Sequence, residues 1–304
     1  MADPALSLVI VGYNMARELP RTVRSLSPAM QREIDPADYE IILVDNGSTQ
    51  PWDEGECRRW CPGLKVHRVA EPTHSPVPAI NQGLALARGG LIGVWIDGAR
   101  LASPGLLAGA LRAARLHRRP VIGTIGFHLG PDLQQRSIQA GYDQAQEDAL
   151  LAAVRWEEDG YRLFEIASFA GSSAGGWFLP IAESNALFLT RAQWEELGGY
   201  DGRFQMPGAG LANLDVWRRA CETTDSQVII LLGEGTFHQI HGGVATNADR
   251  PMYPVFHEEY ERIRGAPFVV PAISPIYLGR VPTATLPKLA RSAEQAIAAV
   301  QGPV

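Results

Sequence analysis

The sequences LSLVIVG at residues 6–12 and YEIILVD at residues 39–45 decide the fold class. The first is a continuous run rich in β-branched residues, which is typical of a strand that is covered on both faces, and the second repeats it. Residues 15–26, between the two runs, have a helix-like pattern. Strand, helix and strand joined by short connections predict an α/β fold with a mostly parallel sheet flanked by helices.

The same alternation continues outward from these two strands. Two further apolar runs end at Ala70 and Asp97, and helical patterns at residues 51–60 and 78–88 precede them. Later segments, among them VIGTIGF, ALFLT and QVIILLG, predict more strands separated by helices. After Pro267 the chain is rich in proline and ends in an alanine-rich helix, which we expect to be an ordered extension of the domain.

Composition excludes several classes of protein. The 304 residues are 46% apolar and 20% charged, which excludes a disordered tail protein and a disulfide-stapled small domain. With 27 basic and 33 acidic residues the net charge is −6, so a nucleic-acid partner is not expected. The three cysteines lack the spacing of a structural zinc site and favour a reduced compartment.

Nothing near the start of the sequence predicts export or membrane insertion. The first residues carry no basic segment, and the apolar run at residues 6–11 is too short for a signal sequence or a spanning helix. We therefore expect a cytoplasmic protein. The arginines at positions 112, 115, 118 and 119 could also contact an anionic membrane surface, although such a set is more often the solvated face of a helix.

Polar residues follow three of the first four predicted strands. Tyr13 and Asn14 follow the first, the sequence DNGS begins at Asp45, and Asp97 ends the fourth. Ligands of parallel α/β sheets gather at these carboxyl ends, where an aspartate can accept a hydrogen bond from a uracil imide or a ribose hydroxyl. DNGS is also ordinary turn chemistry, so Asp45 alone could serve only the backbone.

The absence of other motifs narrows the choice of ligand. No G-x-G-x-x-G follows the first strand, which disfavours a dinucleotide cofactor. The chain also lacks a G-x-x-x-x-G-K-[ST] loop, which disfavours P-loop phosphoryl transfer.

Six segments in a fixed order resemble the family 2 glycosyltransferases, which have the GT-A fold. These segments are SLVIVGYN (7–14), EIILVDNGST (40–49), AINQGLALARG (79–89), LIGVWIDGA (91–99), ESNALFLTRAQWEELGGYDGRF (183–204) and NLDVWRR (213–219). The resemblance covers about residues 6–243 and is specific as an ordered set.

The resemblance implies a division of the chain into two halves and an extension. Residues 1–120 would form the nucleotide-sugar-binding half, and residues 121–265 the acceptor-binding and catalytic half of the same domain. Residues 266–304 would form a proline-rich C-terminal arm and helix, lying on their own chain or on a second copy in a homo-oligomer.

The resemblance also implies roles for five residues in donor binding. Tyr13 resembles the residue that lies against the base, and Asp45 looks like the aspartate that reads it. Asn81 and Arg100 would contact the donor, and Asp97 resembles the first acid of the D-x-D signature, which contacts the ribose and the metal shell.

The sequence departs from this signature at its second acid, which is Ala99. One interpretation is that a divalent metal, Mn²⁺ or Mg²⁺, is held by Asp97 together with His238 or His241. Because residues three apart on a strand point to opposite faces, a site shared by both histidines needs a turn between them. The alternatives are that Arg100, the next helix and the histidines neutralise the phosphates without a metal, or that the histidines are structural.

A second departure concerns the catalytic base. The family's Glu-Asp pair falls on Ala212 and Asn213, which cannot ionise, and Asn213 could instead cap the helix that follows. Asp215 is the first candidate base, although an acid in the first turn of a helix, paired with Arg219, is often structural. Glu183 is the second candidate, because a carboxylate in an apolar run lines a site or lies at a strand edge.

We therefore predict a hexosyltransferase that moves a sugar from a nucleoside diphosphate donor, preferably UDP, to a hydroxyl of a glycan, lipid or small molecule, with inversion. The rival hypothesis is a catalytically degenerate module that binds nucleotide sugars as a scaffold or sensor. A nucleotidyltransferase is disfavoured, because the glycine-rich basic loop that such enzymes carry after the first strand is absent.

Overall fold

The computed structural model describes residues 3–242 and 252–301. Two residues of the predicted donor-binding half, residues 243–251 of the predicted acceptor-binding half and the last three residues of the predicted arm lie outside this description.

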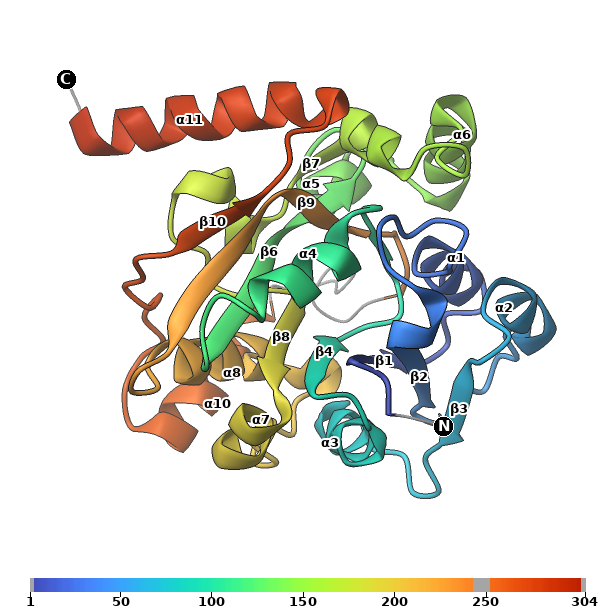
Figure 1. The fold of residues 1–304 in the computed structure, drawn as a ribbon, viewed down its shortest axis with the longest axis horizontal. Coiled ribbons are helices and arrows are strands. Elements are labelled where there is room, and N and C mark those ends of the chain that lie inside the picture. Colours follow the sequence, from blue (N-terminus) through green and yellow to red (C-terminus); the bar gives the residue numbers. More distant parts are fainter. Residues whose placement is uncertain (1–2, 243–251, 302–304) are drawn as a thin grey trace.

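A central sheet with helices on both faces forms the body of the molecule (Figure 1). The strands are β1 (Leu6–Gly12), β2 (Tyr39–Asp45), β3 (Lys65–Arg68), β4 (Leu91–Trp95), β5 (Arg100–Ala102), β6 (Pro120–Leu129), β7 (Ala167–Phe169), β8 (Ala186–Thr190), β9 (Gln227–His238) and β10 (Ile276–Gly279). The α-helices are α1 (Glu18–Ser25), α2 (Glu54–Trp60), α3 (Val77–Leu86), α4 (Leu106–Ala113), α5 (Gln134–Gln139), α6 (Gln144–Val154), α7 (Arg191–Leu197), α8 (Ala212–Cys221), α10 (Tyr253–Arg264) and α11 (Leu286–Gln301).

The sheet is mostly parallel, with one inverted strand in its middle. Its order is β10-β9-β6-β8-β4-β1-β2-β3, and β8 is antiparallel to both of its neighbours, β4 and β6. Strands β1 to β4 therefore run in the same direction as β6, β9 and β10, while the short β5 and β7 pair antiparallel with β9 and β6. The predicted α/β fold is confirmed. The antiparallel strand β8 makes the sheet mixed, which was not predicted because apolar patterning does not encode strand direction.

The inverted strand positions the functional site. The carboxyl ends of β1, β2, β4, β6 and β9 lie at one edge of the sheet, where ligands of α/β proteins bind. Strand β8 begins at this same edge, since Ala186 is paired with Trp95, near the end of β4. The residues that precede β8, 183–185, therefore reach the site from the opposite direction.

Alternate residues of the buried strands feed two hydrophobic cores. On β1, Leu8 and Ile10 pack into the core that α1, α2 and α4 cover, whereas Val9 and Val11 pack into the core beneath α3, α7 and α8. All seven residues of β1 are buried, as expected for a strand with helices on both faces. The two cores hold the strand ends in a fixed arrangement.

The C-terminal arm lies along its own chain. Strand β10 extends the sheet by pairing with β9 in parallel. Helix α11 packs on the 3₁₀ turn at Gly176–Phe178, where the buried Ser292 hydroxyl accepts a hydrogen bond from the Phe178 amide, and its far end projects from the body (Figure 1). Among the described helices, none combines the length and the apolar character that crossing a membrane requires.

Candidate functional site

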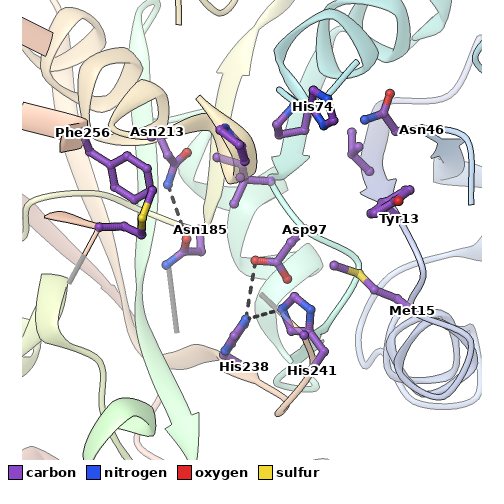
Figure 2. Close-up of a pocket in the computed structure, with 18 of the residues that line it drawn as sticks. Tyr13, Met15, Asn46, His74, Asp97, Asn185, Asn213, His238, His241 and Phe256 are labelled. Carbon is purple, nitrogen blue, oxygen red and sulfur yellow. Dashed lines mark hydrogen bonds and ion pairs between the residues drawn. The ribbon is translucent and has the colours of Figure 1, made fainter. Parts of the chain in front are cut away.

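A cavity of about 1390 Å³ lies at the carboxyl edge of the sheet. Figure 2 shows Tyr13 and Asn46 on one side of it, Asn185 and Asn213 on the other, and Asp97 between them. Its volume exceeds the roughly 300–1,000 Å³ of pockets that hold one small ligand. The cavity therefore has the size for two reactants side by side.

Asp97, His238 and His241 converge at the centre of this cavity. Their ligand atoms all lie within 4.8 Å of one another. His238 Nε2 is 3.1 Å from His241 Nε2 and 3.8 Å from Asp97 Oδ2 (Figure 2). Strand β9 ends at His238, so the chain turns after it and returns His241 to the same side, as a shared site requires.

Gln134 determines which nitrogen of His238 faces the cluster. His238 Nδ1 lies 2.6 Å from Gln134 Oε1, and a proton on Nδ1 that is donated to this oxygen leaves the Nε2 lone pair facing His241 and Asp97. Burial, reinforced by the charge of Arg100, lowers the pKa of His238 well below its usual value, and burial also lowers the pKa of His241. Neutral imidazoles beside a carboxylate are a donor set that fits a divalent cation.

Arg100 adds positive charge to the same part of the cavity. Its Nε donates to Asp97 Oδ2 at 2.8 Å, while Asp97 Oδ1 accepts from the backbone N–H of Ala99 at 3.0 Å. The Nη1 atom of Arg100 is buried and has no hydrogen-bond partner among the described residues. Asp97 and Arg100 thus both line the cavity.

Tyr13 lies at the other side of the cavity, with about half of its surface exposed (51%). The next residue, Asn14, has a left-handed backbone conformation with φ of 52°. Its side-chain Oδ1 accepts hydrogen bonds from the backbone N–H groups of Thr49 and Gln50. This fastens the end of β1 to the loop after β2 and leaves the Tyr13 ring available to lie against a base.

Asp45 is not placed as its predicted role requires, because it does not line the cavity. The buried carboxylate accepts from the Ser48 N–H at 2.8 Å and from the Trp52 indole at 3.3 Å. The turn role is therefore what the structure shows. The following residues, Asn46 and Gly47, line the cavity instead.

Asn81 is also outside the cavity lining. It lies within α3, where its Nδ2 donates to the carbonyl oxygen of Tyr200 at 2.8 Å and its Oδ1 accepts from the Tyr200 N–H at 3.0 Å. This paired contact ties α3 to the segment before α8. Both ends of the amide hold the backbone, and contact of Asn81 with the donor stays a prediction.

Asp215 lies in a buried ion-pair cluster and does not line the cavity. Its Oδ2 accepts from Arg219 Nε at 2.8 Å, and Arg264 makes a two-pronged contact, with Nε 2.6 Å from Oδ1 and Nη2 2.7 Å from Oδ2. The cluster joins α8 to α10. A buried carboxylate whose two oxygens are both held by guanidinium groups cannot reach an acceptor hydroxyl in the cavity, so the geometry does not support Asp215 as the base.

Glu183 lines the cavity and is partly exposed. Its Oε2 accepts a hydrogen bond of 2.6 Å from Asn213 Nδ2. Helix α8 starts at Ala212, and Asn213 lies inside its first turn without capping it, so the predicted cap is wrong. The Asn213 side chain points instead toward the segment before β8 (Figure 2).

Several residues that line the cavity were not predicted from the sequence. The loop after Met206 lines the cavity with Pro207, Gly208 and Gly210, and its buried Ala209 has a left-handed φ of 70°, a strained conformation for a residue with a Cβ. Helix α10 contributes Phe256. The sequence predicted only a glycine-rich connection before α8, and the run PGAG was the available signal for this strained loop.

Comparison with known proteins identifies the family. A family model described as glycosyl transferase family 2 matches residues 7–165, just over half of the chain. The chain belongs to glycosyl transferase family 2. Among curated proteins, none matches this transferase significantly.

Solved structures show that this transferase shares the GT-A fold. TarS 1-349 from S. aureus is 14% identical, with a TM-score of 0.52, and the match covers 86% of this chain and 73% of TarS 1-349. GalNAc-T7, solved with UDP, GalNAc and Mn²⁺, is 17% identical with a TM-score of 0.52, covering 78% of this chain and 44% of GalNAc-T7. The predicted family and fold are therefore confirmed.

Proposed function

We propose that this transferase moves a hexose from a nucleoside diphosphate donor, preferably a UDP-sugar, to a hydroxyl group of a glycan, lipid or small molecule. The observation that carries the proposal is the convergence of Asp97, His238 and His241 at the centre of the cavity. The solved structures of TarS with UDP-GlcNAc and of GalNAc-T7 with UDP support a UDP-linked donor.

Asp97, His238 and His241 would hold a divalent cation. Two imidazole nitrogens favour a first-row transition ion such as Mn²⁺ over Mg²⁺, which prefers oxygen ligands. When bound, the cation offsets the negative charge that develops on the diphosphate leaving group. This donor set compensates for the missing second acid of the D-x-D signature at Ala99.

The chain's own residues bind and orient the two reactants. Tyr13 lies against the base, and Arg100 places its guanidinium beside the diphosphate. The acceptor oxygen forms a bond to the anomeric carbon as the bond from that carbon to the diphosphate oxygen breaks. The nucleoside diphosphate leaves with the electron pair, and attack from the opposite face inverts the anomeric configuration.

Release of nucleotide from a donor panel tests the proposal. Purified protein would be incubated with UDP-glucose, UDP-GlcNAc, UDP-GalNAc and GDP-mannose in Mn²⁺, with water as the acceptor, and free UDP or GDP would be measured. We expect slow release from a UDP-sugar that stops when EDTA is added. Release from no donor, in a protein that still binds UDP, would instead favour the degenerate module.

The degenerate module stays the second candidate because three positions that carry acids in the family signature are Ala99, Ala212 and Asn213. This alternative predicts nucleotide affinity without turnover. The cytoplasmic location and a homo-oligomeric state stay predictions from the sequence.

A further inference from the structure

Only two carboxylates line the cavity among the described residues, Asp97 and Glu183. Asp97 is held by Arg100 and lies against His238, in the cluster that would hold a cation. Glu183 accepts a hydrogen bond from Asn213, which lies with Asn185 on the side of the cavity opposite Tyr13 (Figure 2). A sugar transfer that needs a proton acceptor therefore has one carboxylate available in the described cavity wall.

The contacts of Asn213 hold Glu183 in one orientation. Asn213 Nδ2 faces three acceptors, Glu183 Oε2 at 2.6 Å, the carbonyl oxygen of Ser184 at 3.3 Å and Asn185 Oδ1 at 3.4 Å. On its other side, Asn213 Oδ1 accepts from the buried Tyr200 hydroxyl at 2.9 Å. A reversed amide would place its oxygen against these three acceptors, so the amide can only donate to Glu183.

One of the two carboxylate oxygens of Glu183 is left to accept a proton. Its Oε2 accepts from Asn213, whereas Oε1 has no hydrogen-bond partner among the described residues. Burial and, after it, the charge of Glu183 raise the pKa of the Tyr253 phenol, which also lines the cavity. A partly exposed carboxylate with one oxygen fixed and the other open to the cavity is what a general base requires.

We infer that Glu183 is the catalytic base of this transferase and that Asn213 is its positioning residue, an inference that rests on the proposed function. The proton of the acceptor hydroxyl moves to Glu183 Oε1 while the acceptor oxygen bonds to the anomeric carbon. The carbon–oxygen bond to the diphosphate breaks in the same step, and the leaving nucleotide keeps its electron pair.

The position of Asn213 explains why an amide there is compatible with activity. An aspartate at position 213 would place a second carboxylate next to Glu183, at a contact that is now 2.6 Å. Two carboxylates so close share a proton, which would protonate the base for part of the time. In this chain an amide that donates to Glu183 stands at position 213, and Glu183 itself lies just before β8.

Nucleotide release from the best UDP-sugar of the panel, with Mn²⁺ and water as the acceptor, tests the inference. We expect Glu183→Gln to lower kcat by about 10²–10⁴-fold while the donor KM and the Kd for UDP stay unchanged. Glu183→Asp should keep part of the activity, because it retains a carboxylate. The exposed Glu195→Gln is the matched control and should behave as wild type.

Variants of Asn213 test the positioning role. Asn213→Ala should lower kcat about tenfold with little change in KM, and should have almost no further effect in the Glu183→Gln background. Asn213→Asp, which restores the family's acid, should also lower kcat. Retained UDP binding by calorimetry shows that each variant is folded.

The outcomes separate this inference from the proposed function. A wild type that releases no nucleotide from any donor overturns both. An active wild type whose Glu183→Gln variant is equally active overturns the inference alone. A rise in kcat on Asn213→Asp would also overturn it, because Asn213 would then mark a lost base.

Discussion

Two carboxylates of this transferase, Asp97 and Asp215, each contact arginine but lie in different kinds of surroundings. Asp97 shares its oxygens with one guanidinium and one backbone N–H, and it lies beside His238 and His241 in the cavity. Asp215 is buried between Arg219 and Arg264, and both of its oxygens are held by guanidinium groups. A carboxylate whose two oxygens are both paired with guanidinium groups is therefore structural, whereas one with a single guanidinium contact at a cavity can bind a ligand.

The charge of the surrounding groups makes the same distinction. Near Asp97 the histidines are uncharged, because burial lowers the pKa of His238 and His241. A divalent cation can therefore bind at Asp97 without repulsion from charged histidines. Near Asp215 two permanent cations already balance the carboxylate, so nothing remains for a ligand to supply.

The largest expected effect is on activity, in Asp97→Asn. Removing the carboxylate should lower nucleotide release from UDP-sugars by about 10³-fold, because several kcal/mol of charge stabilisation on the leaving group depend on it. Thermal unfolding should change little, since Asp97 lies at the cavity rather than in a core. Wild-type activity in Asp97→Asn would show that Asp97, like Asp215, does not act in the reaction.

Asp215→Asn should have the opposite effect. Arg219 and Arg264 lose the carboxylate between them, although Arg264 keeps its ion pair with Asp201, so the free energy of unfolding should fall by about 3 kcal/mol. The kcat of the protein that remains folded should stay within a few-fold of wild type. Urea unfolding and nucleotide release measure the two quantities. A stable but inactive Asp215→Asn would show that Asp215 is the base after all.

Glu234 extends the comparison to a buried carboxylate without a guanidinium contact. It accepts from the Ser103 hydroxyl at 2.5 Å and the Tyr161 hydroxyl at 2.7 Å, and burial raises its pKa from 4.5 to about 7. The unfolded chain releases this proton at lower pH than the folded protein does. The contribution to stability is therefore present below pH 4.5 and is lost as the pH rises through about 7.

A comparison of wild type with Glu234→Gln isolates this effect. The difference in unfolding free energy, wild type minus variant, should fall by about 3 kcal/mol between pH 4.5 and pH 8. Urea unfolding at a series of pH values measures it. A difference that does not vary with pH would show that the pKa of Glu234 is the same in the folded and the unfolded protein.

Tyr13→Ala should have the smallest effect. Loss of the ring should weaken UDP binding about tenfold, as expected for the stacking of one base on an aromatic side chain. Tyr13→Phe keeps the ring and should bind UDP as wild type does. Calorimetry with UDP makes the measurement, and equal affinity of Tyr13→Ala and wild type would place the base elsewhere in the cavity.

The sequence predicted the fold and the centre of the site for identifiable physical reasons. Buried runs such as residues 6–12 follow from apolar patterning, and Asp97 falls at a strand end, where ligand contacts concentrate. The cluster with His238 and His241 could be predicted because both histidines follow one strand and a turn between them was possible.

The remaining residues could not be predicted because their roles depend on contacts distant in sequence. Asp215 is structural because Arg264, 49 residues away, completes its ion pair. Asn81 is structural because Tyr200 lies against α3. Glu183 reaches the cavity because β8 is inverted, and strand direction is not written in apolar periodicity.

Binding of UDP with and without Mn²⁺ tests the central claim most directly, that Asp97, His238 and His241 form a cation-dependent nucleotide site. Calorimetric titration of UDP would be carried out in excess Mn²⁺ and in EDTA, on wild type and on His238→Ala. The account predicts that Mn²⁺ strengthens UDP binding to wild type by about 100-fold and that His238→Ala loses this gain. Equal affinity of wild type in Mn²⁺ and in EDTA would contradict it.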